Sequence, residues 1–88
     1  MSIYDTAYRR FLAELRGARQ AVGLSQEELA IRLDKHQTFV SKVEKGQRYL
    51  DVLEFIRWTN ALDVDPVQLV SALRDDVLAR KPRRKSSD

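Results

Sequence analysis

Residues 37–45, QTFVSKVEK, place hydrogen-bonding and cationic side chains on one side of a predicted helix. Val40 and Val43 have the spacing of its buried side. The outer face then holds small or unbranched polar side chains and lysines: Gln37, Thr38, Ser41, Lys42 and Lys45. A solvated helix face usually mixes both signs of charge, yet Glu44, the one acid of the segment, lies by its spacing away from this row. Such a face suits a partner that is a polyanion and offers hydrogen-bonding edges.

Residue types that support catalysis or metal binding are scarce. The chain has no Cys and a single His, His36, which excludes disulfides, thiolate zinc sites and Cys nucleophiles. Its three glycines form no Gly-rich phosphate loop. No carboxylate pairs with a nucleophile and a base at a useful spacing. We therefore expect no catalytic residue, no metal site and no cofactor, and a protein that is not an enzyme.

The net charge of +3 conceals an uneven distribution. Segments 9–19 and 32–48 each carry +3, segment 49–79 carries −4, and residues 80–88 carry +4. A basic side opposite an acidic side suits a partner that meets one face of the molecule. Solvated surface charge is the alternative explanation.

At 88 residues the chain is long enough for one small domain. We expect this domain at 1–80, followed by a disordered basic tail at 81–88 that either follows the backbone of a polyanion or serves as a solubilising end. No apolar run reaches the ~20 residues that cross a bilayer, and the N-terminus does not resemble a signal peptide. The expected location is the cytoplasm, without a membrane partner.

Helical spacing of apolar residues predicts five helices, at about 2–22, 26–33, 37–45, 52–62 and 66–80. Ser25 with Glu28 and Asp51 with Glu54 form capping boxes, while Ser2 with Asp5 is a weaker candidate. Gly23 and Gly46 end helices, and Asp34 and Asp63 occupy turns that need a positive φ. Pro66 suits the first position of the last helix. The sequence thus predicts an all-α, compact five-helix bundle.

The expected buried positions follow these helical stripes. They are Tyr4, Tyr8, Phe11, Leu15, Ala18, Val22, Leu29, Ala30, Leu33, Val40, Val43, Leu50, Phe55, Ile56, Thr59, Leu62, Leu69, Val70, Leu73, Val77 and Leu78. Trp58 lies off the stripe, so it either completes the edge of the core or anchors a second subunit. The last helix has more apolar surface than a small bundle needs. We therefore expect a two-fold homodimer through Trp58, Leu73, Val77 and Leu78.

Residues 25–46 form two short helices joined by residues 34–36, the helix-turn-helix layout in which the second helix can enter a DNA major groove. The run LRGARQAVGLSQEELAIRL, followed by QTFVSKVEKG, LDVLEF and VDPVQL, resembles the XRE family of phage-repressor and Cro-like proteins. The resemblance covers about residues 12–73.

The resemblance implies specific roles. The Gln that opens the first motif helix, here Gln26, grips a phosphate and braces Gln37. Base contacts fall to Gln37, Thr38, Ser41 and Lys42, with Gln37 suited to adenine and Lys42 to guanine. Phosphate contacts fall to Gln26, Lys35, His36, Lys45 and Arg48, although simple exposure is an equal alternative for His36.

Three positions depart from the family pattern. Asp34 and Asp63 replace glycines, at a cost of about 1 kcal/mol each. Phe39 is unusually large for its place in the motif, so it either packs against the preceding helix or touches a thymine methyl.

The resemblance also implies a function: a dimeric repressor that binds a pseudo-palindromic operator in double-stranded DNA. An antitoxin with a toxin partner and a restriction–modification controller share this fold and remain alternatives. A helical protein-interaction module without DNA binding is the alternative from another class.

Overall fold

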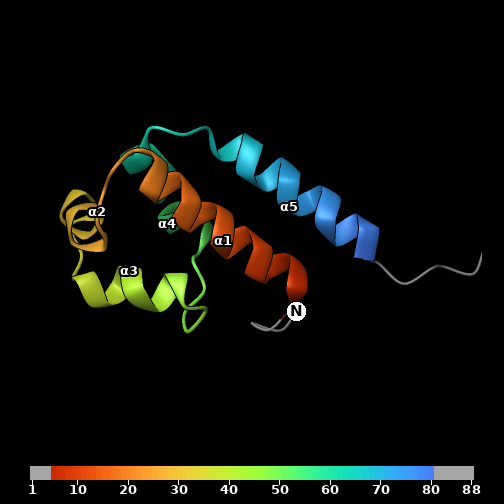
Figure 1. The fold of residues 1–88 in the computed structure, drawn as a ribbon, viewed down its shortest axis with the longest axis horizontal. Coiled ribbons are helices and arrows are strands. Elements are labelled where there is room, and N and C mark those ends of the chain that lie inside the picture. Colours follow the sequence, from red (N-terminus) through yellow and green to blue (C-terminus); the bar gives the residue numbers. More distant parts are fainter. Residues whose placement is uncertain (1–4, 81–88) are drawn as a thin grey trace, which may run out of the picture.

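Five α-helices follow one another in residues 5–80, the part of the chain that the computed structural model describes, and no strand occurs among these residues. The helices are α1 (Thr6–Ala21), α2 (Gln26–Leu33), α3 (Gln37–Glu44), α4 (Val52–Leu62) and α5 (Pro66–Arg80). In Figure 1, α1 runs between α3 on one side and α5 on the other, and both neighbours pack against it. The predicted all-α fold is confirmed. The expected burial of Tyr4 and the predicted tail at 81–88 lie outside the described residues.

The helix boundaries follow from local capping. Both predicted capping boxes form: the Ser25 hydroxyl accepts from the Glu28 N–H, the Asp51 carboxylate accepts from the Glu54 N–H, and each Glu accepts from the N–H of its cap residue. The bonds to Ser25 lower the pKa of the Glu28 carboxyl. The first helix begins later than predicted, because Asp5 itself is its cap and accepts hydrogen bonds from the two N–H groups at positions 7 and 8.

The left-handed turns fall at the predicted positions. Asp34 and Asp63 have φ of 56° and 59°, and Gly23 and Gly46 both have φ of 78°. A side chain at such φ costs about 1 kcal/mol, which Asp tolerates better than most residues. Asp34 thereby ends α2 and lets the chain turn within three residues into α3.

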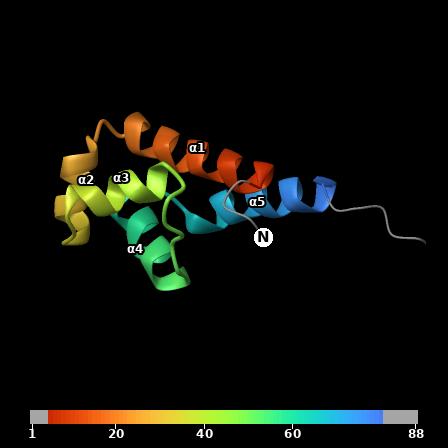
Figure 2. The same ribbon diagram turned by 90° about the horizontal axis from the view of Figure 1, so that it is seen from below.

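The core lies where α1 meets α2, α3 and α4, as Figures 1 and 2 show. Its buried members are Tyr8, Phe11, Leu12, Leu15, Leu29, Ala30, Val40, Val43, Phe55, Trp58 and Leu62. Five expectations were wrong: Ile56, which is 45% exposed, together with Val22, Val70, Val77 and Leu78 lies at the surface. On α4, Trp58 takes the buried place instead, and Phe39 of α3 contacts the indole ring at 6.1 Å between centroids.

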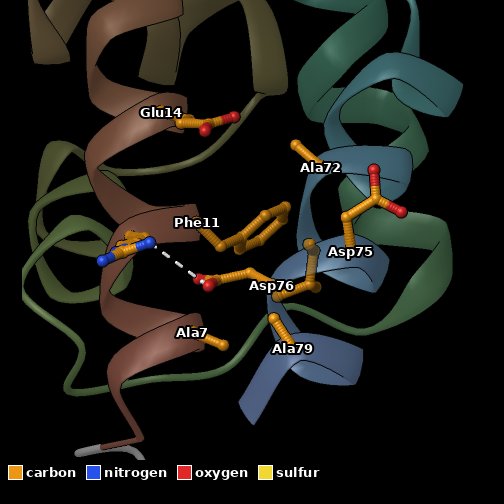
Figure 3. Close-up of a pocket in the computed structure, with 9 residues that line it drawn as sticks. Ala7, Phe11, Glu14, Ala72, Asp75, Asp76 and Ala79 are labelled. Atoms are coloured by element: carbon orange, nitrogen blue, oxygen red, sulfur yellow. Dashed lines mark hydrogen bonds and ion pairs between the residues drawn. The ribbon is translucent and has the colours of Figure 1, made fainter.

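α1 and α5 enclose a hollow of about 300 Å³ (Figure 3). Phe11 and Leu73 line it, and the Arg10 guanidinium reaches the Asp76 carboxylate at 3.2 Å. Among residues 5–80, no group of His, Cys, Asp or Glu side chains is arranged to hold a metal ion. The helices in this range are also too short or too polar to cross a bilayer.

Candidate nucleic-acid interface

α2 and α3 pack against each other through small and branched apolar side chains. Ala30 of α2 and Val40 and Val43 of α3 are buried at this contact and tie the pair to the core. The Lys35 N–H donates to the Ala30 carbonyl at 2.9 Å, which closes the turn. This packing leaves one face of α3 directed away from the bundle.

The outer face of α3 has the predicted character. Gln37, Thr38, Lys42 and Lys45 are exposed, and Ser41 is half-buried. Lys45 is the cap that follows α3 rather than its last residue, so the helix is one residue shorter than predicted. No residue of the described chain covers Thr38 or Lys42, so both side chains are accessible to a partner.

Glu44 points inward from the same helix and forms a buried ion pair with Arg19 of α1. The guanidinium donates through Nε to Oε2 at 2.8 Å and through Nη2 to Oε1 at 3.0 Å. Arg19 Nη1 also donates to the Leu24 carbonyl at 2.8 Å. This bidentate pair fixes α3 against α1, and it accounts for the absence of acid on the outer face.

The buried pair extends by hydrogen bonds to the predicted reading face. Gln26 Nε2 donates to Glu44 Oε1 at 3.0 Å, and Gln37 Nε2 approaches Gln26 Oε1 at 3.5 Å. The two glutamines therefore lie side by side at the start of α2 and the start of α3. Their contact has the geometry in which one amide braces the other.

Phe39 packs against the protein rather than extending from it. Its half-buried ring contacts Trp58 of α4, whereas the packing expected from the sequence was against α2. The Lys35 ammonium lies 5.3 Å from the ring centroid and the Arg48 guanidinium 4.8 Å from it, at cation–π distance. Phe39 thus supports two of the side chains predicted to contact phosphates.

Arg48 is also bound to α4. Its guanidinium donates to both Glu54 oxygens, at 2.8 and 2.9 Å, and to the Tyr49 carbonyl at 2.9 Å. The hydrogen bonds from Arg48 and from the Asp51 N–H lower the pKa of Glu54 to about 2. The same pairing raises the pKa of Arg48. Arg48 is therefore held in one place, with part of its surface still exposed.

The residues predicted to contact phosphates surround the outer face of α3. His36 caps α3 through its backbone, has no side-chain capping bond and is exposed. Lys35 is exposed on the same turn, Gln26 is half-buried at the start of α2, and Lys45 follows the end of α3. What the sequence did not reveal is the role of Arg19 and Glu54, since each pairs with a residue on another helix or loop.

The residues predicted for a dimer interface do not share one environment. Trp58 has no exposed surface, so the prediction that it anchors a second subunit is wrong; it belongs to the core. Leu73 is half-buried against α1, whereas Val77 and Leu78 are exposed near the end of α5.

These features define a helix-turn-helix protein: two short packed helices, a three-residue turn, and an exposed polar face on the second helix. A family model for helix-turn-helix proteins matches residues 15–69, more than half of the chain. An XRE-family like protein from Pseudomonas syringae pv. tomato str. DC3000 has a similar solved structure, with a TM-score of 0.77 and 42% identity over 84% of this chain and 90% of that one. The chain belongs to the XRE family of helix-turn-helix proteins, which are DNA-binding transcription regulators.

Two further similar proteins are controllers of restriction–modification systems. The controller C.AhdI from Aeromonas hydrophila has a TM-score of 0.64 and 38% identity, over 68% of this chain and 87% of that one. Control protein C.BamHI from Bacillus amyloliquefaciens is 36% identical over 47 residues, which is 53% of this chain. That match spans 58% of the length of C.BamHI.

Proposed function

We propose that the protein is a homodimeric, sequence-specific repressor whose α3 reads base pairs in the major groove of double-stranded DNA. Gln37, Thr38, Ser41 and Lys42 are the base-contacting residues, and Gln26, Lys35, His36, Lys45 and Arg48 bind the flanking phosphates. The observation that carries the proposal is the exposed, acid-free face of α3, which the buried Arg19–Glu44 pair holds in position. A repressor of this size excludes polymerase by occupying its operator.

The substitution Gln37→Ala tests the reading face. Using a duplex selected from a random oligonucleotide pool, we expect it to weaken binding by about 1–3 kcal/mol and to relax base choice at one position, because a bidentate contact to a base edge is lost. In contrast, Lys45→Ala should weaken binding to all duplexes about equally and lower the slope of log K against log salt by about one. Fluorescence anisotropy titrations at several salt concentrations measure both effects.

The matched control for this experiment is Gln68→Ala, which makes the same chemical change on the exposed surface of α5. It should leave affinity, base choice and salt slope unchanged. If Gln37→Ala behaved like this control, α3 would not be the reading element. If the wild-type chain bound no duplex even at low salt, the protein-interaction module would replace the repressor as the assigned function.

The homodimer is supported by aliphatic side chains that the isolated chain leaves in water. Leu53 at the start of α4 is 64% exposed and Leu78 near the end of α5 is 56% exposed, with Val52 and Val77 exposed beside them. Burying such side chains contributes about 1.5–3 kcal/mol each. A two-fold dimer of this kind sets two α3 helices about 34 Å apart, one turn of DNA, which suits a pseudo-palindromic operator.

Sedimentation equilibrium at micromolar concentration tests the dimer. The wild-type chain should sediment as a dimer, and both Leu53→Asp and Leu78→Asp should shift it at least tenfold toward monomer, because each would bury an unpaired charge. Ile31→Asp is the control, since Ile31 is 72% exposed on α2, a helix outside the two segments assigned to the interface. A monomeric wild-type chain would refute the dimer, and two dimeric variants would place its interface elsewhere.

Control of a restriction–modification system is the second candidate function. It is favoured by the similarity to the controllers C.AhdI and C.BamHI. The neighbouring reading frames distinguish it from a stand-alone repressor: a nuclease and a DNA methyltransferase beside this gene would support the controller role.

A further inference from the structure

The arginines of α1 are not explained by the reading face alone. Arg19 is committed to the buried pair with Glu44, and Arg10 turns toward α5 and pairs with Asp76. Arg9 and Arg16 remain; both are exposed, and neither forms an ion pair with any residue between 5 and 80. They lie seven residues apart, two helical turns, and so share one face of α1.

Arg9 and Arg16 face a hollow between α1 and the end of α3. This hollow has a volume of about 310 Å³, and Lys45 and Gly46 line its α3 side. Glu44 also borders it, but both of its oxygens accept hydrogen bonds, and Arg19 balances its charge. Three cations without a partner in the described chain therefore surround a space with no uncompensated acid.

The hollow begins where the proposed reading face ends. Lys45 directly follows α3, and Lys42 stands one turn before it on the outer side. In Figure 1, α3 and α5 lie on opposite sides of α1. The strand whose phosphates border the major groove beside α3 can therefore continue along α1.

We propose that Arg9, Arg16 and Lys45 bind the phosphodiester backbone of DNA beyond the base pairs that α3 reads, so that α1 is part of the DNA interface. The inference rests on the proposed DNA-binding function and extends it. The spacing favours a polymer: the Cα atoms of Arg9 and Arg16 are about 10 Å apart at 1.5 Å per residue, and successive phosphates of one strand advance about 3.4 Å along the axis. A run of phosphates spans the two guanidiniums, each of which can hold a phosphate through two parallel hydrogen bonds.

Salt-dependent binding to duplexes of two lengths tests this inference. One duplex carries only the selected operator, and the other extends it by about five base pairs at each end. Arg9→Gln and Arg16→Gln should each lower the salt slope by about one, and the double variant by about two, because each removes one phosphate contact. The double variant should lose roughly tenfold or more in affinity for the long duplex at 150 mM salt, and less for the short duplex.

Arg74→Gln is the matched control, because Arg74 is exposed on α5, on the other side of α1, and pairs with its neighbour Asp75. It should leave both slopes unchanged. Thermal unfolding should be equal for all variants, since Arg and Gln have similar helix propensities. Base choice should also stay as in the wild type, which separates backbone contacts from reading contacts.

Three results would overturn the inference. The first is a double variant that keeps the wild-type slope and affinity while the wild-type chain binds its operator. The second is loss of the affinity difference between wild type and double variant when sodium phosphate is added at constant ionic strength. That result would show that the hollow binds free phosphate ion rather than the DNA backbone. The third is a wild-type chain that binds no duplex at all, which would overturn the proposed function together with this inference.

Discussion

Replacing Glu44 by alanine is expected to lower the free energy of unfolding by about 3–5 kcal/mol, because it leaves the buried guanidinium of Arg19 without its counter-ion. The Glu44 side chain is 2% exposed and the Arg19 side chain 10% exposed, so the guanidinium is largely desolvated and depends on this carboxylate as its counter-ion. A domain of this size has a total stability of roughly 5–10 kcal/mol. The variant should therefore unfold at a much lower urea concentration, measured by circular dichroism.

Two further variants separate the ion pair from a general effect of mutation. Glu14→Ala removes an exposed carboxylate of α1 and should change stability by no more than about 0.5 kcal/mol. The double variant Arg19→Met/Glu44→Leu removes both charges and should recover most of the loss, because a well-packed apolar pair often matches a buried ion pair. Equal stability of Glu44→Ala and Glu14→Ala would show that the pair does not hold α3 in place.

Replacing Trp58 by alanine is expected to cost about 3–5 kcal/mol, the cost of a large cavity in the core. Trp58 is fully buried, and Phe39 rests on it from α3. The loss should therefore loosen the contact between α4 and α3 as well as the core itself. Because Trp58 Nε1 finds no hydrogen-bond partner among residues 5–80, Trp58→Phe loses no protein hydrogen bond and should cost less than about 1.5 kcal/mol.

The two Trp58 variants also test the corrected role of this residue. Trp58→Phe should leave the oligomeric state unchanged in sedimentation experiments, because the indole exposes no surface to a partner. If Trp58→Phe were monomeric, Trp58 would have to be part of the dimer interface after all. A Trp58→Ala variant as stable as Leu53→Ala, which truncates an exposed side chain, would contradict the burial of Trp58.

The sequence predicts the helices well where the signal is local. The capping boxes at Ser25 and Asp51 and the left-handed turns at Asp34 and Asp63 depend on neighbouring residues only, and all four are confirmed. The start of α1 was misplaced because Asp5 can serve either as a cap or as the partner of an earlier cap.

Burial on α4 was harder to predict because it depends on distant elements. Ile56 and Trp58 both border the stripe formed by Phe55, Thr59 and Leu62, and helical periodicity alone does not decide which of them is buried. The structure buries Trp58, which contacts Phe39 of α3, and leaves Ile56 exposed. The end of α5 extends beyond the core, which is why its apolar periodicity overstated the burial of Leu78.

The outer face of α3 could be predicted because Val40 and Val43 fix the opposite side. The Arg19–Glu44 pair could not, since its members are 25 residues apart and each resembles an ordinary surface charge in the sequence. The one available sign was that Glu44 shares a helix with a row of polar and basic residues yet lies off that row. The pairing of Arg48 with Glu54 was hidden in the same way, because the loop that joins α3 to α4 brings them together.

The chain of contacts from Arg19 through Glu44 and Gln26 to Gln37 has a consequence for how operator preference can diverge among descendants of this protein. Gln26 and Gln37 are linked by hydrogen bonds to the buried pair, so exchanging either of them would change the packing of α3 as well as the proposed DNA contact. Thr38 and Lys42 carry no such tie among the described residues and are free in solvent. New target sequences should therefore evolve first through positions 38 and 42, where a change of specificity leaves folding intact.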